Sequence, residues 1–105
     1  MTPESVLKNK VRLRCGELGW VCHHLNVGTF KLEDGTYINT GLPKGFPDLQ
    51  IIKPGEVFYV ETKIKPRKPS KEQLEWIAFL KSMKIGAYVV YTMEEFEEIV
   101  NEKSF

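Results

Sequence analysis

Two short apolar segments joined by a tight turn constrain the fold of this chain more than any other feature. Residues 53–56 read Lys-Pro-Gly-Glu, and proline followed by glycine at the centre of a four-residue turn is the type II pattern. The flanking segments 49–52 and 57–64 are rich in Leu, Ile, Val, Phe and Tyr. The sequence therefore predicts an antiparallel β-hairpin here.

The position of the turn also predicts which side chains share a face of the hairpin. A turn centred between Pro54 and Gly55 opposes Asp48 to Glu61, with their Cβ atoms about 4.5–5.5 Å apart. Lys63 lies two residues beyond Glu61 and therefore points to the same side. Because a type II turn fits a two-residue hairpin poorly, a bulge that shifts the pairing by one residue is the alternative. The opposite face is expected to be core, formed by Leu49, Ile51, Phe58 and Val60.

Helix signals precede and follow this hairpin. The segment 2–4, Thr-Pro-Glu, predicts the start of a first helix that ends near Gly19. Capping-box patterns at 70–73 and 92–95 predict a second helix, ending at Gly86, and a third. The side chains expected to face the core are Val6, Leu7, Val11, Leu13 and Leu18, then Leu74, Ile77, Ala78, Leu80 and Met83, then Phe96, Ile99 and Val100.

Strand patterns occupy most of the remaining segments. A short strand is expected over 20–25, and a small hairpin over 29–38 around an Asp-Gly turn. Glycines and prolines make 40–47 a loop, and 87–91 reads as a buried strand. The crossover from the hairpin through the second helix to this strand predicts a right-handed parallel βαβ unit. We therefore expect one α/β domain over 1–105 with a mixed sheet (α+β), in the order α-β-β-β-α-β with a short C-terminal helix.

Composition fits a soluble globular domain and excludes several other classes of protein. Hydrophobic residues make up 42% of the chain and charged residues 28%, without an apolar run long enough for a membrane span. The charged N-terminal segment is not a signal peptide. Cys15 and Cys22 are therefore expected to be half-buried free thiols of a cytoplasmic protein.

Charge is unevenly distributed although its net value is only +1. Residues 94–105 contain five glutamates and one lysine, which gives −4 there and leaves +5 on the rest of the chain. A basic body suits a phosphate-facing surface, and ordinary solvated faces explain it equally well.

Asp48, Glu61 and Lys63 carry the strongest chemical signal. Two opposed carboxylates repel each other unless a cation lies between them, and hard oxygen ligands suit Mg²⁺ or Mn²⁺. Such a metal activates water while a lysine stabilises developing charge, which is what phosphodiester hydrolysis requires. A surface salt bridge between Lys63 and either carboxylate is the alternative. A run of cations favours phosphate binding instead: Lys63, Lys65, Arg67, Lys68 and Lys71.

These residues resemble a known pattern. Gly45-Phe46-Pro47-Asp48, then a hairpin, then Glu61-Thr62-Lys63 is similar to the signature of the PD-(D/E)XK nucleases. The resemblance is closer to the VRR-NUC family, the virus-type replication-repair nuclease domain, in its stand-alone form. Its members also show a helix start bearing serine and glutamine, here 70–73. The resemblance runs from about Glu4 to Tyr91 and implies a restriction-endonuclease-like core.

The resemblance implies a role for each matching position. Asp48 and Glu61 would ligate Mg²⁺ or Mn²⁺, with the backbone carbonyl of Thr62 as a further ligand. Lys63 would be the catalytic lysine. The cations that would contact DNA are Lys44, Lys65, Arg67, Lys68 and Lys71.

Two further positions match less specifically. Gln73 would orient a group near the metal or the scissile phosphate, and closing a capping box with Ser70 explains it equally well. Glu4 would bind the metal through water or complete the acidic cluster, and a favourable charge at a helix N-terminus is the alternative. His23 and His24 alternate along the first strand, and nothing near them has the spacing of metal ligands.

The function that the resemblance implies is structure-selective cleavage of DNA, in particular of four-way (Holliday) junctions by a symmetric homodimer. Flap or duplex cleavage by the same core is one alternative, and a non-catalytic nucleic-acid-binding module is another. A module without chemistry has no need to hold two carboxylates together. Most aromatic residues are expected in the core, whereas Trp76 is a candidate dimer contact that Trp76→Ala would test by light scattering. Tyr37 and Asn39 are candidates for touching DNA.

Overall fold

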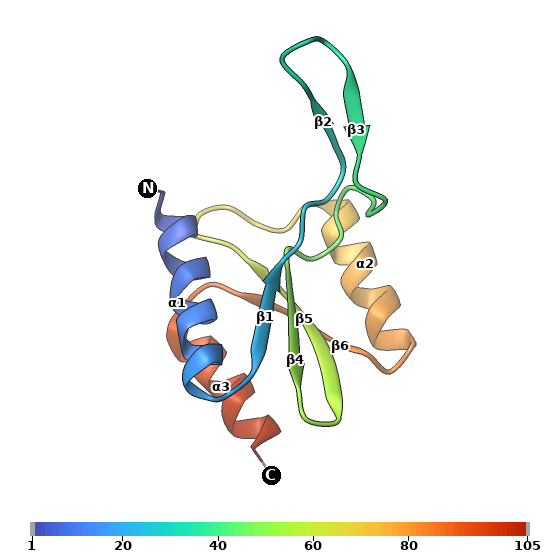
Figure 1. Cartoon of the computed structure of the whole chain (residues 1–105). Coiled ribbons are helices and arrows are strands. Elements are labelled where there is room, and N and C mark those ends of the chain that lie inside the picture. Colours follow the sequence, from blue (N-terminus) through green and yellow to red (C-terminus); the bar gives the residue numbers. More distant parts are fainter. Residues whose placement is uncertain (1, 105) are drawn as a thin grey trace.

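The fold consists of a four-stranded sheet with helices on both faces and a separate two-stranded hairpin (Figure 1). The computed structural model describes residues 2–104. The elements are α1 (Pro3–Glu17), β1 (Val21–His24), β2 (Thr29–Lys31), β3 (Tyr37–Asn39), β4 (Leu49–Lys53), β5 (Glu56–Thr62), α2 (Lys71–Ser82), β6 (Gly86–Val90) and α3 (Met93–Lys103). Among these described residues, no helix is both long and apolar enough to span a bilayer.

The main sheet has the strand order β1-β4-β5-β6. β4 is antiparallel to both β1 and β5, whereas β6 runs parallel to β5 after the crossover through α2. The predicted mixed sheet and the order α-β-β-β-α-β with a C-terminal helix are confirmed for this sheet. The small hairpin β2–β3 forms a sheet of its own and projects from the end of the main sheet near the start of α1 (Figure 1).

The central hairpin has the predicted register. Ile52 pairs with Val57, and Gln50 pairs with Tyr59, so no bulge shifts the two strands. Gly55 adopts φ +77°, the left-handed conformation that the third position of a type II turn requires and that glycine adopts without strain.

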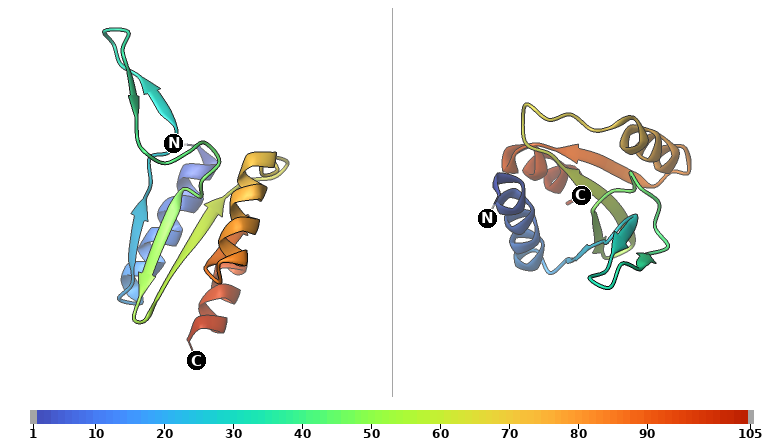
Figure 2. Two further views of the ribbon diagram at one scale, coloured as in Figure 1. Left: turned by 90° about the vertical axis from the view of Figure 1, so that its right-hand side faces the viewer. Right: turned by 90° about the horizontal axis from the view of Figure 1, so that it is seen from above.

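The two faces of the sheet are covered unequally. α1 and α3 lie on one side and α2 on the other (Figures 1 and 2). On the α1–α3 side, the four hairpin residues expected in the core are fully buried, as predicted: Leu49, Ile51, Phe58 and Val60. On the other side, Ile77 and Leu80 of α2 pack with Ala87 of β6 in a smaller cluster.

Several predicted core positions are wrong because each helix touches the sheet along a narrow stripe. Leu13 is 71% exposed, and α1 instead buries Leu7, Val11 and Cys15, which recur every four residues. The other predicted core residues that prove exposed are Val6, Leu74, Ala78 and Met83. In α3 the predicted residues Phe96, Ile99 and Val100 are buried.

The end of α2 and the cap of α3 differ from prediction. α2 ends at Ser82, Lys84 takes the left-handed conformation with φ +62°, and Gly86 is the first residue of β6. A Cβ on Gly86 would lie 3.0 Å from the Cβ of Phe58, so packing between strands explains this glycine. At α3, Thr92 caps the helix, but the Glu95 carboxylate accepts from the Tyr91 N–H instead of closing a capping box.

Candidate active site

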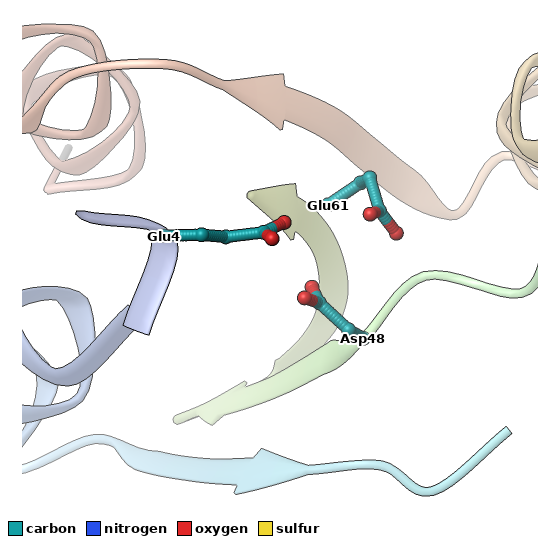
Figure 3. Close-up of side chains that lie close together, drawn as sticks. All are labelled: Glu4, Asp48 and Glu61. Carbon is teal, nitrogen blue, oxygen red and sulfur yellow. The ribbon is translucent and has the colours of Figure 1, made fainter. Parts of the chain in front are cut away.

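Three carboxylates from distant parts of the sequence meet at one end of the sheet. Glu4 comes from the first turn of α1, Asp48 directly precedes β4, and Glu61 lies near the end of β5 (Figure 3). One carboxylate oxygen from each residue lies within 4.8 Å of the other two. The predicted convergence of Asp48 and Glu61 is therefore observed, and Glu4 joins them.

The backbone around each carboxylate fixes its position. Thr2 caps α1 by accepting from the Ser5 N–H, which places Glu4 in the first helical turn. The Asp48 carbonyl accepts from the Leu25 N–H at 2.8 Å, and this bond ties the entrance of β4 to the end of β1. Thr62 donates to both carboxylate oxygens of Asp48, through its N–H at 3.3 Å and its hydroxyl at 3.1 Å. Asp48 is thus held against β5 before any ligand binds.

The loop before Asp48 explains the Gly-Phe-Pro-Asp pattern. Gly45 has φ +93°, and a Cβ there would lie 2.7 Å from the Cβ of Glu72. Only glycine lets this loop approach the first turn of α2 so closely. The Phe46 ring packs edge-on against Tyr59 and Trp76, both with ring centroids 5.3 Å away. The loop therefore anchors Asp48 to α2 as well as to the sheet.

Glu61 is a buried carboxylate with a raised pKa. Only 4% of this residue is exposed, and burial together with the negative charge of Asp48 raises the pKa of Glu61 to about 8. Lys63 and Lys8 oppose this rise, and Glu4 adds to it. A buried carboxylate whose charge is disfavoured by another carboxylate has a high demand for a cation.

Gln73 makes both of the contacts that its two predicted roles require. Its Oε1 atom accepts from the Ser70 N–H at 2.8 Å, which closes the capping box of α2. Its Nε2 atom donates to Glu61 Oε2 at 3.1 Å. One amide therefore joins the start of α2 to the buried carboxylate, and this double use explains why capping and a site role could not be separated in the sequence.

Two lysines flank the carboxylates. Lys63 Nζ lies 3.7 Å from Glu61 Oε2, and both side chains are largely buried, so the pair is not the solvent-exposed salt bridge considered above. Lys8 Nζ lies 3.0 Å from Asp48 Oδ2. Lys8 did not stand out in the sequence, although its position four residues after Glu4 places it on the same side of α1. This four-residue spacing from Glu4 is the signal in the sequence that could have identified Lys8 as part of the site.

The cations predicted to contact DNA lie in different parts of the molecule. Lys65 and Arg67 line a pocket of about 320 Å³ to which Glu4 also contributes, whereas Asp48 and Glu61 do not line it. Lys44 lies elsewhere, in a pocket of about 520 Å³ at the base of the small hairpin. Lys68 is exposed, and Lys71 is exposed beside Glu75, 3.9 Å away.

The histidines and cysteines lie outside the carboxylate group. His23 and His24 are both exposed, and His23 Nδ1 is 3.2 Å from Gln50 Oε1. Cys15 and Cys22 are free thiols, as predicted; Cys22 is half-buried as expected, whereas Cys15 is fully buried.

The donor set fits a hard divalent cation. Three carboxylates within reach of one another offer the oxygen ligands that Mg²⁺ and Mn²⁺ prefer. Burial is the largest cause of the raised pKa of Glu61, and the charge of Asp48 is the next. Asp48 and Glu61 could hold such an ion, with Glu4 completing the group.

Replacing Gln73 is expected to weaken metal binding at Glu61 and to lower the stability of the fold only slightly. Gln73→Ala removes a capping contact and the donor to Glu61, so we expect a loss of about 1 kcal/mol in unfolding free energy and weaker binding of Mn²⁺. Ser70→Ala is the matched control, since it removes the other half of the capping box without touching Glu61. Isothermal titration calorimetry and chemical denaturation would measure both quantities. Equal metal affinity in the two variants would contradict a positioning role.

Comparisons with known proteins support this fold independently of the site. No family model and no curated protein matches the chain. A solved structure of a VRR_NUC domain superimposes with a TM-score of 0.73 over 100% of both chains, at 20% sequence identity. Similarity at that level of identity concerns the architecture, and it confirms the fold that the sequence motifs implied. The chain thus has the fold of a VRR_NUC domain.

Proposed function

We propose that this chain is a metal-dependent endonuclease that hydrolyses phosphodiester bonds in DNA. The observation that carries the proposal is the meeting of Glu4, Asp48 and Glu61 within 4.8 Å, with Lys63 beside them. The structural match to a VRR_NUC domain, by its name a nuclease domain, supports the proposal.

The cofactor in this proposal is Mg²⁺ or Mn²⁺. Asp48 and Glu61 would hold the ion, the carbonyl of Thr62 would add a ligand, and Glu4 would bind it directly or through water. When bound, the ion supplies a water of lowered pKa and positive charge for the phosphate. The remaining steps belong to side chains of the chain itself.

The protein groups have separate tasks. Lys63 places a compact positive charge next to Glu61, which would stabilise the negative charge that develops on the phosphoryl oxygens. Gln73 holds the Glu61 carboxylate through its amide, and Thr62 holds Asp48 through two hydrogen bonds. Fixed carboxylates need little reorganisation when the substrate arrives, which favours the transition state.

The substrate in this proposal is branched DNA, in particular a four-way junction. Lys65 and Arg67 share a pocket with Glu4 and would bind phosphates near the scissile bond. Lys44, Lys68 and Lys71 lie farther out and would extend this contact along the backbone. Cleavage of a junction in two symmetric strands requires two copies of the site, and a homodimer would provide them.

A cleavage assay on labelled DNA tests the proposal. The substrates are a four-way junction, a flap and a linear duplex, each incubated with Mg²⁺, Mn²⁺ or EDTA. We expect paired, symmetric cuts in the junction with either metal and no cuts in EDTA. Preferential cutting of the flap or of the duplex would keep the nuclease and reject junction selectivity. Tight binding without cleavage of any substrate would reject the nuclease and leave a nucleic-acid-binding module.

A further inference from the structure

The two cysteines lie on facing surfaces of the first helix and the first strand, which pack beside each other (Figure 1). Cys15 belongs to the buried stripe of α1, after Leu7 and Val11, and it is fully buried. Cys22 of β1 pairs with Ile51, whose side chain is buried on the α1–α3 side of the sheet. Paired residues share a face, so Cys22 points towards α1, and it packs against the core cluster that contains Cys15.

The connection between these two elements is short and closely held. α1 ends at Glu17, and β1 begins at Val21. The Trp20 N–H donates to the Cys15 carbonyl at 2.8 Å, so the chain just before β1 is fixed against the last turn of α1. Gly19 adopts φ +76°, a conformation that lets the chain reverse here without strain. The reversal holds the strand close to the helix at the level of the two thiols.

Cys22 is the thiol of this pair that a small molecule can reach. It is half-buried and lines a surface pocket of about 500 Å³, which is formed by α1, the turn after it and β1. Arg12 and Trp20 line the same pocket. Cys15, in contrast, has no exposed surface. A small oxidant that enters the pocket therefore meets Cys22 first, with Cys15 behind it.

The acidities of the two thiols agree with this order. A hydrogen bond between their side chains is the largest cause of both pKa shifts: it raises the pKa of Cys15 and lowers that of Cys22. Burial adds to the rise at Cys15. At Cys22 burial opposes the fall, and the positive charge of Arg12 favours it. Because the thiolate is the reactive form of cysteine, Cys22 is the nucleophile of the pair, and Cys15 keeps its proton.

We propose that Cys15 and Cys22 are a redox pair, which hydrogen peroxide converts to a disulfide between α1 and β1. The Cys22 thiolate attacks one peroxide oxygen, the O–O bond breaks, and hydroxide leaves as the sulfur becomes a sulfenic acid. The Cys15 sulfur then attacks the Cys22 sulfur, so that the S–S bond forms, the S–O bond breaks, and the departing oxygen takes the Cys15 proton to become water. Overall, the two thiols are oxidised to one disulfide, and hydrogen peroxide is reduced to two molecules of water.

The disulfide would have two consequences for the protein. It would restrain two elements that support the carboxylates, since α1 carries Glu4 and Lys8, and the residue after β1, Leu25, donates to the Asp48 carbonyl. It would also protect Cys22, because a sulfenic acid without a second thiol beside it is oxidised further to the irreversible sulfinic acid. The bond itself lies at the opposite end of α1 from Glu4, so the proposal does not rest on the function of the carboxylates.

The test is treatment of the reduced, metal-free protein with hydrogen peroxide, followed by intact-mass measurement and thermal melting. We expect each chain to lose the mass of two hydrogen atoms and both thiols to become inert to iodoacetamide after denaturation. The oxidised protein should melt roughly 5–10 °C above the reduced protein, because the bond restricts the unfolded chain. Dithiothreitol should reverse all three changes.

Two variants separate the roles of the thiols, and circular dichroism checks that each is folded. Cys15→Ala should gain oxygen atoms at Cys22, which then has no partner, whereas Cys22→Ala should keep its mass because Cys15 is buried. A wild-type chain that keeps its mass and both thiols under these conditions would overturn the proposal, and so would a disulfide that joins two chains. Oxygen adducts on wild-type Cys22 without a disulfide would reject Cys15 as its partner. None of these results depends on whether the protein cleaves DNA.

Discussion

Lys63→Ala is expected to abolish nearly all cleavage, with a fall of about 10²–10³-fold in the single-turnover rate. The Lys63 ammonium lies 3.7 Å from Glu61 Oε2 and is largely buried, so in the proposed mechanism its charge would act at short range on the phosphate. The metal and Lys63 would stabilise the developing negative charge from different positions, so the metal would not compensate for the loss of the lysine. Single-turnover cleavage of a junction at saturating protein and Mn²⁺ would measure the effect.

Metal binding distinguishes this role from a structural one. Removing Lys63 takes away a cation near Glu61 without removing a ligand, so Mn²⁺ affinity should be maintained or rise. Lys10→Ala is the matched control, because Lys10 is exposed on α1 and has no part in the carboxylate group. Cleavage by Lys63→Ala within a few-fold of wild type would show that Lys63 only forms an ion pair with Glu61.

Asp48→Asn is expected to remove the stabilisation of the protein by Mn²⁺. A ligand at one hundred times its dissociation constant raises the unfolding free energy by about 2.7 kcal/mol, and the variant should lose this gain. Asparagine keeps an oxygen that can accept from the Thr62 N–H, so the fold should persist. Thermal melts with Mn²⁺ and with EDTA would measure the difference, and Asp34→Asn on the small hairpin is the control.

The same melts have an expected dependence on pH. The pKa of Glu61 is about 8 in the folded protein and near 4.5 when exposed, so between these values only the folded protein keeps the proton. The metal-free protein should therefore lose stability as pH rises through this window. Metal binding displaces the proton, so the stabilisation by Mn²⁺ should grow over the same window. If the stabilisation by Mn²⁺ stayed constant from pH 6 to 8, Glu61 would not be a ligand of the metal.

In Asp48→Asn the pKa of Glu61 should fall, because the charge of Asp48 is one of the causes of its rise. The destabilisation of the metal-free protein at high pH should then shrink relative to wild type. Asp48→Asn should thus reduce the loss of stability of the metal-free protein at high pH and also remove the stabilisation by Mn²⁺. One variant therefore tests both effects of the Asp48 carboxylate.

Local sequence signals determined the secondary structure and the central hairpin. The Pro-Gly turn placed Gly55 where a positive φ is needed and set the register of β4 on β5, and with it the common face of Asp48 and Glu61. Thr2 and Ser70 marked the starts of two helices through short-range hydrogen bonds. Such signals act within a few residues, so the sequence alone carries them.

Only the tertiary structure decided which helical side chains reach the sheet. Leu13, Leu74 and Met83 have the apolar character of core residues, yet the orientation of each helix on the sheet leaves them exposed. That orientation depends on how whole elements pack, which periodicity along one helix does not determine.

The tertiary structure also completed the candidate site. Lys8 lies 3.0 Å from Asp48 only because α1 runs beside the start of β4, forty residues later in the chain. Likewise, the raised pKa of Glu61 comes from burial beneath the starts of α1 and α2, which no local pattern reports. The sequence determined which residues could form the site, and the packing of distant elements determined their burial and their hydrogen-bond and ion-pair partners.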